Sequence, residues 1–309
     1  FTNDPNVVII FMESVGLNRM GLMGNPLNPT PVLDSLSSNG AFFSKFYIPW
    51  VSTSRSVFTM LTGVPDVARR TSSRNPIIRD QYSIISQFKD YDKYYMIGGS
   101  ASWANIRSLV TYNIKGMRLV EMEDFDRPRV DVWGISDLDL FREANNILRE
   151  SENSKKSIFT IIQTAGNHRP YTIPKDNEGF KIKSVEKGAL KSAGFKSIEQ
   201  FNAIRLLDHS IGKFFKMASE SSYFDNTVFV LFGDHGTADP KAEHMKADDY
   251  DLKLRSYNVP LIIYAPKILG SLKEITAASG LADLMPTIAG ICRIPYLNKT
   301  MGRDIFKSK

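Results

Sequence analysis

The segment at residues 227–237, TVFVLFGDHGT, limits the possible folds more than any other part of the chain. Its apolar residues run without interruption and stop at Gly233-Asp234-His235-Gly236. Such a run, bounded by glycine, is typical of a strand buried on both faces of a sheet. Open α/β sheets bind ligands outside the carboxyl ends of their strands. Asp234 and His235 are therefore candidate metal ligands, although an Asp that caps a helix beside an incidental His explains the same dipeptide.

A second segment, NVVIIFM at residues 6–12, has the same form and also ends in an acid, Glu13. If the sheet is parallel, the carboxyl ends of both strands lie at one edge, and Glu13 lies on the same edge as Asp234. Shorter apolar runs predict further strands, and apolar residues spaced three or four apart predict helices between them. The predicted strands are 41–48, 94–97, 157–163 and 259–265; the predicted helices are 31–38, 80–89, 136–150, 198–215 and 280–291; and polar loops are expected at 175–196 and 238–254.

This alternation predicts an α/β fold with a central, largely parallel sheet sandwiched by helices. At 309 residues the chain is long enough for one large domain. We expect a single catalytic domain over 1–309, in which the residues from about 255 can form a smaller C-terminal subregion. Asp208 falls inside helix 198–215, where we expect it on the surface.

A hydroxyl-rich segment, Ser52-Thr53-Ser54-Arg55, precedes a helical pattern that ends at Gly63. Serine and threonine ahead of a helix are commonly N-caps, and that interpretation stays open. Backbone N–H groups at a helix start bind anions, and a hydroxyl can act as a nucleophile. Thr53 and Arg55 together therefore suit attack on a phosphate or sulfate ester.

Two more strand ends carry polar side chains. Trp103, Asn105 and Arg107 follow a glycine pair after strand 94–97, and they can supply an apolar wall and anion-binding donors to a pocket. A turn with a packed tryptophan and a surface arginine explains them equally well. His168 stands just after strand 157–163.

Glu13, Thr53, Asp234 and His235 make a set of two carboxylates, one hydroxyl and one imidazole. Such a set suits one divalent metal ion, Mn²⁺ or Zn²⁺. A cation at Thr53 would lower the pKa of the hydroxyl group, so that its oxygen could attack an ester and form a phospho-threonine.

Charge and composition indicate which kinds of molecule the protein surface can bind. Lys plus Arg number 39 and Asp plus Glu 33, which gives a net charge of +6. We find no basic and aromatic stripe of the kind that nucleic-acid binders carry, so the surplus favours a surface near anionic phospholipid. No apolar run approaches the roughly 18 residues of a membrane span. Because the chain starts at Phe1 rather than Met, we expect an excised or processed domain from which a signal or anchor could have been removed, and the single Cys292 excludes an internal disulfide.

The order of several segments along the chain resembles the alkaline phosphatase and sulfatase superfamily. Within it, the chain is most similar to the lipoteichoic acid synthase type of phosphoglycerol transferase. The segments that carry the resemblance are NVVIIFMES, NPTPVLDSLSSNGAFFSKFY, TSRSVFTMLTGVPD, GNHRPYTIP, NAIRLLDHSIGKFF, VFVLFGDHG, YNVPLIIYAP and DLMPTIAG.

The resemblance implies an alkaline phosphatase-like fold and assigns roles to individual residues. The matched metal ligands are Glu13, Thr53, Asp234 and His235, and Thr53 is also the matched nucleophile. His168 matches a residue that contacts the substrate or the leaving group. Trp103, Asn105, Arg107 and Arg55 are the remaining substrate-binding candidates.

The resemblance implies the transfer of a phosphoglycerol or phosphoethanolamine head group from a lipid to a hydroxyl acceptor. The implied donor is an anionic phospholipid. The acceptor would be a glycan or a glycerol-phosphate chain, with no nucleic acid involved. The implied location is the extracytoplasmic face of a bacterial cell membrane, in the periplasm or at the cell surface, with the membrane reached through the missing N-terminal region.

Three alternatives stay open. A phosphodiesterase or phosphatase would use water as the acceptor. A sulfuric ester hydrolase is the poorer match, because sulfatases place Cys or Ser in a C-x-P-x-R setting, whereas Thr53 cannot become formylglycine and no proline follows it at the second position. The third alternative is a catalytically inactive binding domain, against which the intact ligand set argues.

Overall fold

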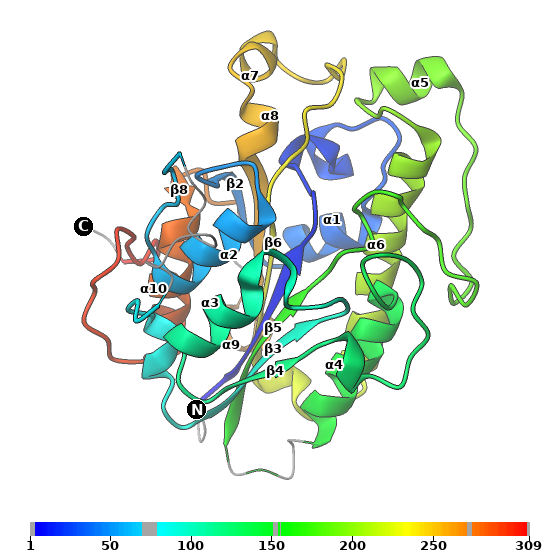
Figure 1. The fold of residues 1–309 in the computed structure, drawn as a ribbon. Coiled ribbons are helices and arrows are strands. Elements are labelled where there is room, and N and C mark those ends of the chain that lie inside the picture. Colours follow the sequence, from blue (N-terminus) through cyan, green and yellow to red (C-terminus); the bar gives the residue numbers. More distant parts are fainter. Residues whose placement is uncertain (1–3, 70–78, 151–153, 155, 271–273, 308–309) are drawn as a thin grey trace.

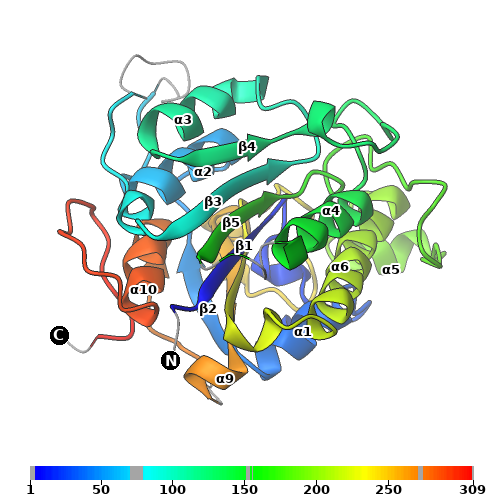
Figure 2. The same cartoon turned by 90° about the horizontal axis from the view of Figure 1, so that it is seen from below.

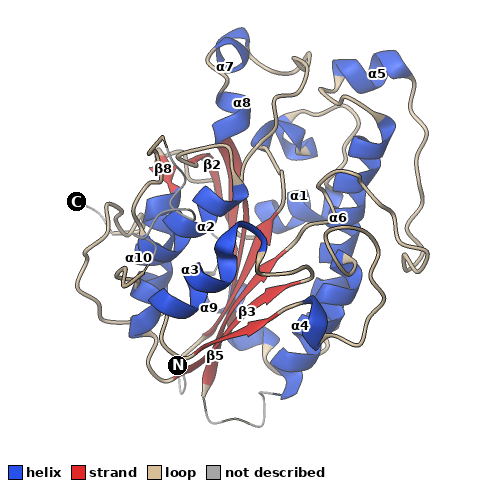
Figure 3. Ribbon diagram, viewed as in Figure 1, coloured by secondary structure: helices blue, strands red, loops and turns tan. Residues whose placement is uncertain are grey.

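The centre of the molecule is a sheet whose strands follow the order β4-β3-β5-β1-β6-β7-β2-β8 (Figures 1 and 3). The structure is a computed structural model that describes residues 4–69, 79–150, 154, 156–270 and 274–307, so that Phe1 lies outside the described residues. The strands are β1 (Asn6–Met12), β2 (Ala41–Tyr47), β3 (Tyr91–Ile97), β4 (Met117–Val120), β5 (Ser157–Gln163), β6 (Thr227–Gly233), β7 (Asn258–Tyr264) and β8 (Ser279–Gly280).

Strand directions place several strand ends at one edge. β1 lies between β5 and β6 and is parallel to both, and β3 is parallel to β5 and β4. β7 is antiparallel to its neighbours β6 and β2. The prediction of a largely parallel sheet is therefore confirmed. The residues after 255 contribute β7 and β8 to this same sheet.

Helices cover both faces of the sheet (Figure 2). Alternate residues of β1 point to opposite sides: Val7, Ile9 and Phe11 join one core cluster, and Val8, Ile10 and Met12 join the other. The first cluster includes residues of α2 (Thr53–Thr62), α3 (Ile106–Asn113) and α10 (Leu284–Ile291); the second includes residues of α1 (Pro31–Ser38), α4 (Asp137–Glu150) and α6 (Ile198–Ser219). Burial on both sides explains why β1 and β6 are continuously apolar.

Several predicted elements need correction. The predicted helix 80–89 is only a 3₁₀ turn, Ile84–Gln87, because Ser83 caps it and its backbone bonds, such as Phe88 N–H to the carbonyl of Ile85, follow the three-residue pattern and end at Phe88. The predicted loops contain short helices: α5 (Lys187–Ser192) lies in 175–196, and α7 (Ala247–Asp251) and the start of α8 (Leu254–Tyr257) lie in 238–254. The last predicted helix begins at Leu284 after a 3₁₀ turn, and α9 (Pro266–Leu269) follows β7.

Asp208 is not on the surface of α6, as its sequence position suggested. It is buried, and its two carboxylate oxygens accept hydrogen bonds from the backbone N–H groups of Val32 (3.0 Å) and Leu33 (2.9 Å) in the first turn of α1. These N–H groups have no partner within their own helix, so Asp208 caps α1 from a distant part of the chain. Among the helices of the described ranges, none is both long and apolar enough to cross a bilayer.

Candidate active site

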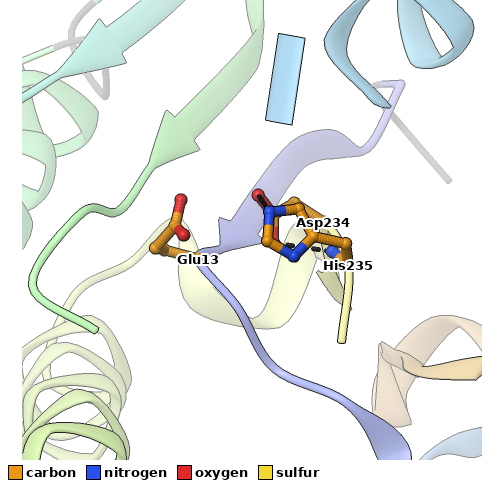
Figure 4. A group of neighbouring side chains, drawn as sticks. All are labelled: Glu13, Asp234 and His235. Atoms are coloured by element: carbon orange, nitrogen blue, oxygen red, sulfur yellow. Dashed lines mark hydrogen bonds and ion pairs between the residues drawn. The ribbon is translucent and has the colours of Figure 1, made fainter. Parts of the chain in front are cut away.

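Two neighbouring strands bring three ligand groups together. β1 and β6 pair with Met12 opposite Gly233, so Glu13 and Asp234 leave the sheet side by side. One ligand atom from each of Glu13, Asp234 and His235 can be chosen so that all lie within 4.8 Å of one another. Figure 4 shows the three side chains converging from the ends of the two strands. The register of a parallel sheet thus builds this cluster from residues far apart in sequence.

Thr53 reaches the same cluster from the first residue of α2. Its hydroxyl oxygen lies 3.4 Å from Oε2 of Glu13 and 3.5 Å from Nε2 of His235. The Ser56 hydroxyl, one turn further, donates to the backbone carbonyl of Asp234 at 2.6 Å and fixes α2 against this loop. The structure therefore brings together all four residues that the sequence singled out as metal ligands.

The two carboxylate oxygens of Asp234 have different surroundings. Oδ1 accepts hydrogen bonds from the backbone N–H groups of Ser14 (2.7 Å) and His235 (2.6 Å). Oδ2 is buried and has no hydrogen-bond partner among the described residues, while it lies 3.5 Å from Nε2 of His235. A buried polar atom without a partner is costly, and a bound cation would remove that cost.

The tautomer of His235 suits a metal ligand. Its Nδ1 lies 2.8 Å from the carbonyl oxygen of Gly236, which can only accept, so the hydrogen of the neutral ring is on Nδ1. Nε2 then carries the lone pair on the side of Thr53 and Asp234. The donor set of two carboxylates, a hydroxyl and an imidazole therefore fits one divalent cation.

Electrostatics support the same interpretation. Burial, together with the nearby charge of Asp234, raises the pKa of Glu13 to about 7. Burial likewise raises the pKa of Asp234 to about 7. Two buried carboxylates this close disfavour each other's ionised forms, and a cation between them would reverse that effect.

A cavity of about 100 Å³ opens beside the cluster. Glu13 and Thr53 form one side of it, and Trp103, Trp133 and His168 line other parts. The two indole rings meet edge to face, with centroids 5.7 Å apart. Trp103 and His168 were predicted from the sequence as pocket residues, whereas Trp133 was not. Its only sequence signal is a lone tryptophan before Gly134, which predicts nothing about a site on its own.

Three predicted substrate contacts lie outside the residues that line this cavity. Arg55 is buried, and its guanidinium group donates to the carbonyl oxygens of Asp66 (3.1 Å) and Ala68 (2.7 Å). The structure thus gives Arg55 a role in holding the chain after α2, and its predicted anion contact stays a prediction. Arg107 pairs with Glu121 and is half exposed.

The third of these, Asn105, adopts a left-handed backbone conformation (φ 60°) just before α3. Residue type suggested these three contacts, together with sequence proximity to Thr53 for Arg55 and to Trp103 for Asn105 and Arg107. They could not reveal that Glu121 and the carbonyl groups after α2 take up the two guanidinium groups.

Comparison with known proteins agrees with the fold, which matches that of the alkaline phosphatase superfamily. A solved structure from that superfamily, from Vibrio parahaemolyticus, superposes with a TM-score of 0.83 at 24% identity, covering 99% of this chain and 71% of that one. The lipoteichoic acid synthase structure from Listeria monocytogenes gives 0.82 at 21% identity, covering 98% and 76%. The chain belongs to the sulfatase family, whose sequence model, described as Sulfatase, matches residues 5–294.

Relatives of this chain include both lipoteichoic acid synthases and arylsulfatases. Lipoteichoic acid synthase 1 of Bacillus subtilis (strain 168) is 24% identical over 321 residues, covering 97% of this chain and 48% of that protein. Arylsulfatase A of Homo sapiens is 39% identical over 59 residues, or 19% of this chain. The chain spans about half the length of the lipoteichoic acid synthases it matches. The resemblance inferred from the motifs is confirmed, in a superfamily whose members are enzymes that use divalent metal ions.

Proposed function

We propose that this domain transfers a phosphoglycerol or phosphoethanolamine head group from a phospholipid to a hydroxyl acceptor, through a phospho-threonine on Thr53. The observation that carries the proposal is the position of the Thr53 hydroxyl, 3.4 to 3.5 Å from Glu13 and His235. The homology to lipoteichoic acid synthases supports phosphoglycerol as the transferred group, and we propose the same class of reaction for this chain.

The reaction has two displacements at phosphorus. In the first, the Thr53 hydroxyl loses its proton as its oxygen forms a bond to the phosphorus of the donor lipid, the bond from phosphorus to the glyceride oxygen breaks, and the released alcohol takes up a proton. In the second, the acceptor hydroxyl loses its proton and attacks the phosphorus, and the bond to Thr53 breaks. A divalent cation held by Glu13, Thr53, Asp234 and His235 would lower the pKa of the Thr53 hydroxyl and offset charge on the phosphate.

The chain's own groups orient this chemistry. Thr53 begins α2, so the phosphate would lie near the backbone N–H groups of the first turn, where the helix dipole favours an anion. His168 lines the cavity with its Nδ1 2.9 Å from the Arg169 carbonyl oxygen, which leaves Nε2 to exchange a proton with the departing alcohol. The cavity of about 100 Å³ is below the usual size for drug-like ligands and suits a head group rather than an acyl chain.

We further propose that the donor of phosphoglycerol is an anionic phospholipid, that the acceptor is a glycan or glycerol-phosphate chain, and that the domain works at the extracytoplasmic face of a bacterial membrane. Mn²⁺ and Zn²⁺ both suit the ligand set, and titrating the metal-free protein with each ion would identify the active metal.

Mass spectrometry tests the proposal directly. The protein is incubated with vesicles of phosphatidylglycerol or of phosphatidylethanolamine, with Mn²⁺ or Zn²⁺, and the peptide that contains Thr53 is sequenced. We expect a phosphoglycerol or phosphoethanolamine adduct on Thr53, and none in a Thr53→Val control. Head-group release by both proteins, with no adduct in either, would overturn the assignment.

Sulfate ester hydrolysis is the second candidate, because the family includes arylsulfatases and one of them matches a segment of this chain at 39% identity. Thr53 argues against it, since threonine cannot supply the aldehyde that sulfatases form from Cys or Ser. Turnover of p-nitrophenyl sulfate at a rate comparable to that of a p-nitrophenyl phosphodiester would favour the sulfatase. Transfer to water instead of an acceptor alcohol would appear as free glycerol phosphate in the same lipid assay.

A further inference from the structure

A buried carboxylate, Asp137, holds the loop that carries His168. Asp137 is the first residue of α4, and its two oxygens accept hydrogen bonds from the backbone N–H groups of Ala165 and Gly166, each at 3.0 Å. It is only 7% exposed. The proposed reaction gives this carboxylate no chemical role, although burying it is costly. Its two bonds both go to the loop that follows β5.

Trp133 holds the same loop at a second point. Its ring lies 4.3 Å from the ring of His168, centroid to centroid. The indole Nε1–H donates to the carbonyl oxygen of Arg169 at 2.6 Å, and Nδ1 of His168 lies 2.9 Å from that same oxygen. One carbonyl group therefore accepts from both rings. This shared acceptor fixes the Nδ1–H tautomer of His168 and the plane of its ring.

The close approach of the two segments requires glycine. A Cβ added at Gly166 would lie 2.7 Å from Oδ2 of Asp137, and one added at Gly134 would lie 1.9 Å from the carbonyl oxygen of Gly98. Gly134 also has a φ of +113°, which other residues rarely adopt. The segment 133–137 therefore packs against Gly98, just after the end of β3, on one side and contacts the His168 loop on the other.

We propose that Asp137 and Trp133 are positioning residues that hold His168 in one tautomer and one orientation at the cavity. This inference rests on the proposed function, in which His168 exchanges a proton with the leaving alcohol. Without the two contacts, the His168 ring could rotate away, because its remaining hydrogen bond is to the carbonyl of its own neighbour. Thr53, Asp234 and His235 lie on other elements, whereas the backbone of Glu13 bonds to Thr164 and Asn167 in the same loop, so bound metal is measured in every variant.

The choice of leaving group separates this role from a merely stabilising one. A p-nitrophenolate leaves without a proton, whereas the alkoxide of a lipid glyceride needs one. Loss of positioning should therefore slow transfer from the lipid and largely spare a p-nitrophenyl phosphodiester. A general loss of structure would slow both substrates equally.

The variants Asp137→Asn, Trp133→Leu and Gly166→Ala each disturb one contact. For Asp137→Asn and Gly166→Ala, which lie outside the cavity lining, we expect kcat with the lipid donor to fall about 10- to 100-fold and kcat with the aryl diester to change less than about threefold, while Trp133→Leu should slow transfer from the lipid. Trp133→Phe keeps the ring contact and should recover part of the rate. Asp139→Asn is the matched control, because Asp139 lies in the same helical turn but binds Ser136 and Arg142 instead of the loop.

A measurement without turnover completes the test. Nitrogen-15 spectra of labelled histidine, with His168 assigned from a His168→Gln variant, report which ring nitrogen carries the hydrogen. We expect the Nδ1–H form in the wild type and averaged nitrogen shifts in Trp133→Leu, with bound metal unchanged. Nitrogen shifts of His168 that stay unaltered in Trp133→Leu, or an equal loss of kcat with both substrates in the Asp137 variant, would overturn the inference. If the wild type fails to turn over either substrate, the proposed function fails, while the spectra still decide whether Trp133 positions His168.

Discussion

The hydroxyl oxygen of Thr53 lies 3.5 Å from Nε2 of His235, although 182 positions separate the two residues in the chain. One begins a helix on one face of the sheet, and the other follows a central strand. The hydrogen of the His235 ring is held by Gly236, so the lone pair of Nε2 and the threonine oxygen are free to bind one cation. The same arrangement explains how an unreactive hydroxyl could become a nucleophile.

Replacing the proposed nucleophile should remove turnover without unfolding the protein. We expect Thr53→Ala to lower kcat by at least about 10³-fold, as found when a covalent nucleophile is deleted. Release of p-nitrophenol from a phosphodiester measures the rate, and circular dichroism checks the fold. A Thr53→Ser variant, which keeps a hydroxyl group, should retain part of the activity. Full activity of the alanine variant would exclude Thr53 as the nucleophile.

Metal binding should depend on Asp234, whose Oδ2 has no hydrogen-bond partner among the described residues. We expect Asp234→Ala to lower the affinity for Mn²⁺ or Zn²⁺ by at least about 100-fold, the upper end of what even indirect contacts to a metal site contribute. Calorimetric titration of the metal-free protein measures this change. Asp248→Asn, at an exposed acid in α7, serves as the control. Equal affinities in all three proteins would disprove the ligand assignment.

Asp208 should make stability depend on pH. Burial raises the pKa of its carboxyl group to about 7, above the value of 3.8 expected without burial. A group with a raised pKa binds its proton more tightly in the folded state than in the unfolded state. Its stabilising contribution to the free energy of unfolding is therefore complete below the pKa of the unfolded state and is lost as the pH rises through about 7. We therefore expect the free energy of unfolding of the wild type to fall between about pH 4 and pH 7 relative to Asp208→Asn.

Urea unfolding of both proteins at several pH values measures this difference. Other buried carboxyl groups, including Glu13 and Asp137, titrate in the same range, and the comparison between the two proteins cancels their contribution. Parallel curves would show that Asp208 titrates alike in the folded and unfolded states.

A buried ion pair next to the active site should be important for stability. Nη2 of Arg19 lies 2.5 Å from Oδ2 of Asp239, and both side chains are at most 2% exposed. Asp239→Asn leaves the guanidinium charge buried without its partner, which costs about 3–5 kcal/mol. Chemical denaturation measures the loss. The exposed pair of Arg142 and Asp176 provides the control, because Asp176→Asn should cost no more than about 1 kcal/mol.

Much of the fold and the ligand set could be predicted because the central strands are buried on both faces. Continuous apolar runs as short as those of β1 and β6 are typical of such strands, and each run ends abruptly in an acid. Parallel pairing then requires that Glu13 and Asp234 meet. The short β4 and the helix α3 were missed, since four residues of mixed polarity and an eight-residue helix carry little periodic signal.

The residues that hold the site together could not be predicted in the same way. Trp133 and Asp137 act through backbone groups of a loop that is distant in sequence, and neither residue type indicates such a contact. Arg55 and Arg107 show the opposite problem, because an arginine near a pocket suggests an anion contact, while the fold supplies other partners for both. The type of a residue limits the groups that it can bind, and the tertiary structure determines which of those groups lies within reach.

The place of β1 in the middle of the sheet has a consequence for biosynthesis. The partners of this first strand, β5 and β6, begin at Ser157 and Thr227, so it emerges from the ribosome well before either exists. Until then, an uncovered apolar segment has no edge to join, and pairings across such distances form slowly. A nascent chain of this design must be kept from aggregating until β5 and β6 have been made.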